Sequence, residues 1–105
     1  MVLMLETTQQ GFLVNGSDWN ETVAHQLADG CHITLTPAHW EIIHFIRDYY
    51  QQFKHLPNMR VFTKAIAKTL GEDKGNSRYL HGLFPDAPLR DACKLAGLPK
   101  PPTCL

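Results

Sequence analysis

The sequence predicts a mainly helical domain of the α+β class: a small helical bundle with an N-terminal β-hairpin and an extended, flexible C-terminal arm. Helix start signals recur through the chain, each followed by apolar residues at helical spacing. The last eight residues contain three prolines, which exclude a helix there. The 105 residues suit a single domain, with the hairpin over 1–16, the helical body over 17–97 and the arm over 98–105.

The N-terminal hairpin is predicted from two short apolar runs on either side of a polar segment. Residues 3–5 and 11–14 would form the strands, and residues 7–10 would form the turn between them.

Five helices are expected from N-cap residues, prolines at the first helical position and glycines after the last turn. The second carries apolar residues on more than one face, which is typical of the central helix of a bundle. In chain order they run from Ser17 or Asp18 to about Ala28 before Gly30, from Pro37 after Thr36 to about Lys54, from Asn58 to Leu70 before Gly71, from about Asn76 to Phe84, and from Pro88 to Gly97.

The composition is that of an ordinary soluble globular protein, with 44% hydrophobic and 19% charged residues. No stretch is apolar enough to cross a bilayer and no secretory signal is visible, so a cytoplasmic location without membrane insertion is expected. The first 46 residues carry five acids and no Lys or Arg, while the remainder carries ten bases and five acids. Either the C-terminal half meets an anionic partner or the two halves attract each other.

Three cysteines in a chain without an export signal argue against a structural disulfide framework. Cys104, one residue from the end of the arm, is the first candidate for chemistry, because a proline-rich segment offers a thiol little to pack against. Gly97 is the expected hinge. Cys93 lies eleven residues upstream on the last predicted helix, close enough along the chain to form a reversible disulfide with Cys104. Cys31 is expected to be a partly buried residue without a role in the chemistry.

The reactivity of these thiols depends on nearby charges, because the thiolate is the nucleophile. Arg90, three residues before Cys93 on the same helical face, and Lys94 beside it are expected to favour the Cys93 thiolate. The chain-terminal carboxylate opposes ionisation of Cys104, and Lys100 partly offsets it.

Other functional classes find weaker support in the sequence. The six histidines show no metal-ligand spacing and no nucleotide-binding motif is present, so neither a metal nor a cofactor is expected. The helices over 58–70 and 76–84 resemble a helix-turn-helix, but a protein without net charge lacks the basic excess of a DNA-binding regulator. The bases of this region would more readily dock an acidic protein partner or tRNA-bound machinery; they are Arg60, Lys64, Lys68, Lys74 and Arg78.

The C-terminal motif reads ACKLAGLPKP over residues 92–101 and is followed by the penultimate cysteine. This motif closely resembles that of the DsrC/TusE family of sulfur-relay proteins, and residues 35–41, 45–50 and 75–85 are similar to the family too. The resemblance implies a helical fold with a small N-terminal hairpin, and a persulfide carried on the cysteine that matches Cys104. The chain would then be a sulfurtransferase-type carrier, a co-substrate of sulfur-donor and sulfur-acceptor proteins rather than a stand-alone catalyst.

The resemblance leaves two branches of the family open. The sulfite-reductase-associated branch has both cysteines and can hold sulfur in a bridge between them, whereas the tRNA-thiolation branch generally keeps only the penultimate one. The presence of Cys93 and Cys104 favours the first branch, dissimilatory sulfur metabolism with sulfite reductase as a partner. The alternative is a TusE-type relay for tRNA 2-thiolation, with Tus-type relay proteins as partners and a possible weak contact with nucleic acid.

Overall fold

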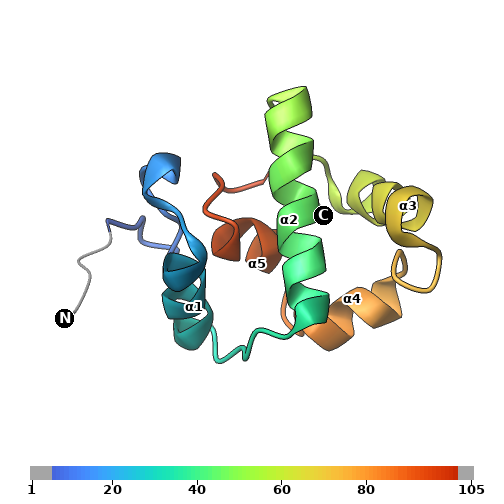
Figure 1. Ribbon diagram of the computed structural model, residues 1–105, viewed down its shortest axis with the longest axis horizontal. Helices are drawn as coiled ribbons and strands as arrows, with labels where there is room; N and C mark the ends of the chain where they lie inside the picture. Colours follow the sequence, from blue (N-terminus) through green and yellow to red (C-terminus); the bar gives the residue numbers. More distant parts are fainter. Residues whose placement is uncertain (1–5, 102–105) are drawn as a thin grey trace.

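The computed structural model describes residues 6–101, and this part of the chain is helical. A short 3-10 turn, η1 (Gly16–Asp18), precedes the α-helices drawn in Figure 1. The helices are α1 (Glu21–Gly30), α2 (Pro37–Phe53), α3 (Met59–Leu70), α4 (Ser77–Leu83) and α5 (Pro88–Leu95). The predicted mainly helical class is confirmed.

Helix α5 lies at the centre of the packing, in contact with α1, α2 and α4. In Figure 1 it sits between α1 and the long α2, and α3 lies beyond α2. Six of the eight residues of α5 are buried, including Cys93 and Leu95. The last predicted helix is therefore part of the core, which fixes the surroundings of everything that follows it in the chain.

The starts of three helices are set by local capping, as predicted. The side chains of Thr36, Asn58 and Asn76 each accept a hydrogen bond from the backbone N–H three residues further on. Such a cap typically stabilises a helix by ~1 kcal/mol, because the first N–H groups of a helix have no partner within it. These starts depend only on neighbouring residues, so they can be predicted from the sequence.

A buried histidine joins the start of α2 to the end of α4. Nδ1 of His39 accepts from the backbone N–H of Thr36 at 3.1 Å, so the ring proton belongs on Nε2. Nε2 lies 2.8 Å from the carbonyl oxygen of Leu83 and donates to it. The neutral imidazole thus satisfies both of its nitrogens inside the bundle.

The first helix begins later than predicted. Asn15 caps η1, and this turn takes up Ser17 and Asp18, the two residues expected to cap the helix. Asn20 caps α1 instead, by accepting from the backbone N–H of Val23 at 2.9 Å. Asparagine, serine and aspartate are comparable N-caps, so the sequence pattern could not rank them.

The predicted N-terminal hairpin is wrong in the part that the structure describes. Residues 6–16 contain no strand, and a single antiparallel bridge joins Thr7 to Leu13. Phe12 and Leu13 are both buried, whereas consecutive side chains of a half-buried strand point to opposite faces. The segment is an irregular loop that delivers Phe12 to the core; the other predicted strand, residues 3–5, lies outside the described residues.

Candidate functional site

Cys104, the first candidate from the sequence, lies outside the described residues. Of the predicted arm over 98–105, the structure describes the part up to Pro101. The site is therefore built from the groups around the start of the arm and around the other two cysteines.

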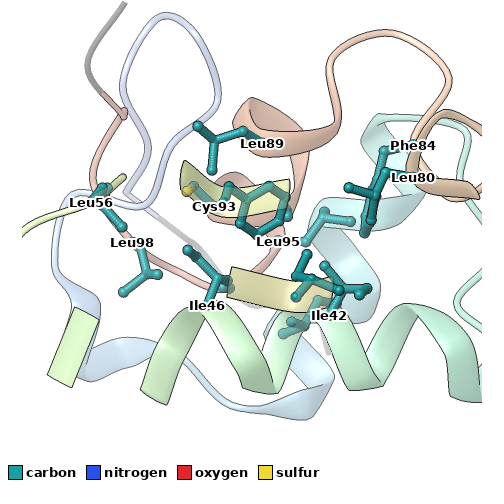
Figure 2. Close-up of a cluster of buried hydrophobic side chains, with 14 of the residues drawn as sticks. Ile42, Ile46, Leu56, Leu80, Phe84, Leu89, Cys93, Leu95 and Leu98 are labelled. Atoms are coloured by element: carbon teal, nitrogen blue, oxygen red, sulfur yellow. The ribbon is translucent and has the colours of Figure 1, made fainter. Parts of the chain in front are cut away.

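Cys93 is a core residue in this structure. Figure 2 shows its sulfur within a cluster of apolar side chains that includes Leu56, Leu89 and Leu98, and the exposed fraction of Cys93 is 0%. Burial raises the pKa of Cys93 to about 12, because the apolar surroundings disfavour the thiolate. At neutral pH the thiol is protonated and shielded from solvent in this conformation.

In this conformation Arg90 and Lys94, which were expected to favour the Cys93 thiolate, contact other groups. Nε of Arg90 lies 3.2 Å from a carboxylate oxygen of the buried Asp91. Nζ of Lys94 lies 5.5 Å from the centroid of the Phe12 ring. Helical spacing brings both bases close along the chain, but desolvation is the cause that sets the pKa of Cys93.

The three predicted thiolate-stabilising cations do come together, at the surface. Arg90, Lys94 and Lys100 line one hollow of about 330 Å³, whose other walls are Gln10 and Phe12. Three cationic side chains around one hollow favour an anionic group there. The structure thus joins the arm cation to the two helix cations, and it places them beside the arm rather than around Cys93.

Cys31 is half-buried at the end of α1, as expected, and it responds to the same cations. Burial raises the pKa of Cys31, while Lys94 and, after the opposing effect of Asp91, Arg90 act to lower it. Cys31 and these bases are far apart along the chain, and only the packing of α1 against α5 brings them together, so sequence spacing gives no sign of their proximity.

The predicted hinge, Gly97, closes the end of α5. Its φ is +71°, and its N–H donates to the carbonyl oxygen of Lys94 at 3.2 Å. The N–H of Leu98 donates to the carbonyl oxygen of Cys93 at 3.0 Å, which completes a Schellman motif. Leu98 and Pro101 are buried, so the described start of the predicted arm packs against the body in this conformation.

Two residues that the sequence analysis missed hold this helix end. Nε1 of Trp19 donates to the carbonyl oxygen of Leu95 at 2.8 Å, and Nη1 of Arg47 donates to that of Ala96 at 2.7 Å. The guanidinium carbon of Arg47 lies 3.9 Å from the centroid of the Trp19 ring. The one sequence feature that could have pointed to Arg47 is its position directly after Ile46, an apolar residue that is buried on α2.

The helix pair that resembled a helix-turn-helix has one of its bases neutralised within the bundle. Nζ of Lys74, in the turn between α3 and α4, donates to both carboxylate oxygens of Glu41 on α2, at 2.8 and 2.9 Å. Within residues 6–101, no group of three or more His, Cys, Asp or Glu side chains is placed to hold a metal ion. None of the described helices is long and apolar enough to cross a membrane.

Comparison with known proteins matches the chain to one family over almost its whole length. The family described as "DsrC like protein" matches residues 3–105. The chain is 54% identical to sulfurtransferase TusE of Photorhabdus laumondii, over 96% of this chain and 91% of that protein. It is 52% identical to a TusE homolog of Haemophilus influenzae, over 96% of this chain and 93% of the relative.

Solved structures with the same fold come from DsrC proteins. The NMR structure of DsrC from Allochromatium vinosum superposes with a TM-score of 0.88 at 46% identity, covering 96% of this chain and 90% of that one. The crystal structure of the oxidized gamma-subunit of the dissimilatory sulfite reductase from Archaeoglobus fulgidus gives a TM-score of 0.82 at 39% identity, covering 96% and 92%. At these identities the likeness extends to sequence as well as fold.

Proposed function

The chain belongs to the DsrC-like family of sulfur-relay proteins, and on this premise we propose that it carries sulfur as a persulfide on Cys104 between partner proteins. The observation that carries the proposal is the family match through residue 105, which includes the penultimate cysteine and the motif before it. The partners would be a protein that donates sulfur and a protein that accepts it.

The transfer needs one thiolate and no external oxidant or reductant. The Cys104 thiolate attacks the outer sulfur of a donor persulfide, a new S–S bond forms on Cys104, and the S–S bond of the donor breaks. The donor cysteine leaves as a thiolate with the electron pair of that bond. Attack of an acceptor thiolate on the outer sulfur of the Cys104 persulfide repeats the exchange and restores the Cys104 thiolate.

The hollow lined by Arg90, Lys94 and Lys100 supports this role. The reactive forms of a thiol and of a persulfide are anions, and three cations around one hollow stabilise an anion there. Lys100 stands four residues before Cys104 in the sequence, so a short stretch of chain separates the cysteine from these cations. Positive charge near a thiol favours its thiolate, which is the nucleophilic form.

The burial of Cys93 favours a carrier in which Cys104 works alone. A disulfide between Cys93 and Cys104 requires the two sulfurs to touch, and Cys93 is 0% exposed with its pKa raised to about 12. Together with the 54% and 52% identity to proteins named TusE, this favours the TusE-type relay. The second candidate is a two-cysteine carrier serving sulfite reductase, favoured by the presence of Cys93 and by the likeness to DsrC structures.

Persulfide loading followed by intact mass measurement tests the assignment to Cys104. Wild type should gain one sulfur atom, about 32 Da, from a persulfide donor, and Cys104→Ser should not, because a serine hydroxyl cannot exchange with a persulfide. Cys31→Ser and Cys93→Ser are matched controls that should still load. Undiminished loading of Cys104→Ser would overturn the assignment.

Thiol mapping distinguishes the two carrier modes. Brief treatment with a bulky alkylating reagent should modify Cys104 first, the half-buried Cys31 more slowly and Cys93 only after unfolding. Mild oxidation followed by peptide mapping should then yield few intrachain links between Cys93 and Cys104. Rapid, complete formation of that link would favour the two-cysteine carrier instead.

A further inference from the structure

We propose that Trp19 and Arg47 form a clamp that fixes the root of the cysteine arm and thereby positions Cys104 for transfer to protein partners. Both residues contact the chain immediately before and at Gly97, the position expected to act as a hinge. The effect of the clamp on sulfur transfer rests on the proposed function, whereas the contacts of the clamp can be tested without any sulfur chemistry.

The first support is that, at the end of α5, each of the last four backbone carbonyls accepts a hydrogen bond. The carbonyls in the last turn of a helix have no partner within the helix and need one from elsewhere. The Schellman motif supplies two partners from the next residues of the chain, and the clamp supplies two from distant elements. The carbonyls concerned are those of Cys93 and Lys94 for the motif, and of Leu95 and Ala96 for the clamp.

The second support is that the clamp residues hold each other and the hinge position. The Arg47 guanidinium lies over the Trp19 ring, a cation–π geometry that favours one orientation of both side chains. A Cβ atom built on Gly97 would lie 2.5 Å from Cδ1 of Trp19, so the indole packs directly on the Gly97 backbone. Turning the chain at Gly97 would separate these groups.

The third support is the packing that continues past the clamp. Leu98 is 7% exposed and Pro101 is also buried, so the chain is held against the body at these two positions, while Pro99 and Lys100 between them are exposed. Only three residues lead from Pro101 to Cys104, against seven from Gly97. The largest reach of Cys104 from its fixed root is therefore about 10 Å with the clamp closed, and about 23 Å if the chain is released at Gly97.

A shorter arm concentrates the cysteine where a partner docks. The effective concentration of a tethered group falls with roughly the −3/2 power of tether length, so releasing the root should lower it about three- to fourfold. Trp19 and Arg47 are positioning residues in this scheme: they touch the root of the arm and act on transfer through Cys104.

Hydrogen exchange tests the clamp without any sulfur chemistry. In Arg47→Met, which keeps much of the side-chain stem but loses the donors, the amides of Gly97 and Leu98 should exchange roughly tenfold faster. Amides in the interior of α3 should be unchanged, and Arg47→Lys should recover part of the protection. Arg60→Met, which removes an exposed arginine from α3, is the matched control and should change neither set.

Transfer kinetics test the consequence. Loading of Cys104 from glutathione persulfide, a small donor, should be equal in wild type and Arg47→Met. Transfer to a Tus-type acceptor protein, which has to dock before its cysteine reacts, should fall about three- to fourfold in kcat/KM. If Arg47→Met does not fold, Trp19→Phe keeps the ring and removes the indole donor, and it should shift both readouts in the same direction.

Two outcomes would overturn the clamp. The first is unchanged exchange at Gly97 and Leu98 in both Arg47→Met and Trp19→Phe. The second is faster exchange at these amides while transfer to the protein acceptor is unchanged or faster. Failure of the proposed function looks different. In that case wild type itself does not load sulfur on Cys104, while the exchange experiment still reports on the clamp.

Discussion

Helices α3 and α5 finish on the same sequence signal, a glycine after the last apolar residue, yet the two ends are built differently. Gly71 has a φ of +116°, and its N–H bonds back to carbonyls of its own helix, those of Ile66 and Ala67. Gly97 is held by a Schellman motif and also packs against Trp19, a residue from the other end of the chain. A local signal ends both helices, but tertiary contacts decide how firmly each end is held.

The faces of the two helices differ in the same way. α3 buries Phe62 and Ile66 out of twelve residues, whereas α5 buries six of its eight. A change in α5 or at its end therefore disturbs the core, and a change in the exposed part of α3 meets mainly water.

Alanine at the two glycines should give the largest difference between these ends. At Gly97 the left-handed backbone and the overlap with Trp19 act together, and we expect a loss of about 3 kcal/mol in the free energy of unfolding. At Gly71 the backbone, with φ +116° and ψ 154°, also disfavours alanine, but the atom that a Cβ would meet is the end of the Asp73 side chain, 2.6 Å away, which can swing aside, so about 2 kcal/mol is expected. Denaturant titration of both variants measures these losses, and a loss at Gly97 no larger than that at Gly71 would contradict the predicted ranking.

Alkaline pH should reveal the buried thiol of α5. The folded pKa of Cys93 is about 12 and its reference value is 9.0, so the unfolded chain loses this proton first as pH rises. The free energy of unfolding should therefore fall between pH 9 and 12, by about 1.4 kcal/mol per pH unit and about 2 kcal/mol by pH 10.5, through this group.

The control for this prediction is a comparison of variants. Cys31→Ala should keep most of the wild-type slope above pH 9, because it keeps the fully buried Cys93 and loses only the half-buried Cys31. Cys93→Ala should start less stable at pH 8, owing to the cavity, and then show a shallower slope. Parallel slopes in wild type and Cys93→Ala would contradict the burial of this thiol.

The smallest of these effects should come from the two tryptophans. Trp19→Phe removes the donor to the Leu95 carbonyl, and we expect a loss of about 1–2 kcal/mol. Trp40→Phe changes an indole that stacks on His44 and should cost less than half as much. Thermal melts of the two variants compare the α5 end with a site away from it, and a larger loss for Trp40→Phe would reverse the ranking.

Much of the helical fold follows from local patterns. Thr36, Asn58 and Asn76 cap the next residues along the chain, so their helices begin where the sequence predicts. The prediction of an N-terminal hairpin was wrong because Phe12 and Leu13 are both buried. Their burial depends on which segments pack against them in the folded chain. A short apolar run indicates burial, but it does not by itself distinguish a strand from a loop in which two consecutive side chains are buried.

The sequence by itself determined the helices, the family resemblance and the cysteine that we propose as the sulfur carrier, because each depends on a short motif. Only the tertiary structure decided the environment of the other groups. It buried Cys93, gathered Arg90, Lys94 and Lys100 at one hollow, and brought Trp19 and Arg47 to the end of α5. Desolvation and long-range hydrogen bonds depend on which segments meet in space, and residue spacing along the chain does not predict which segments meet.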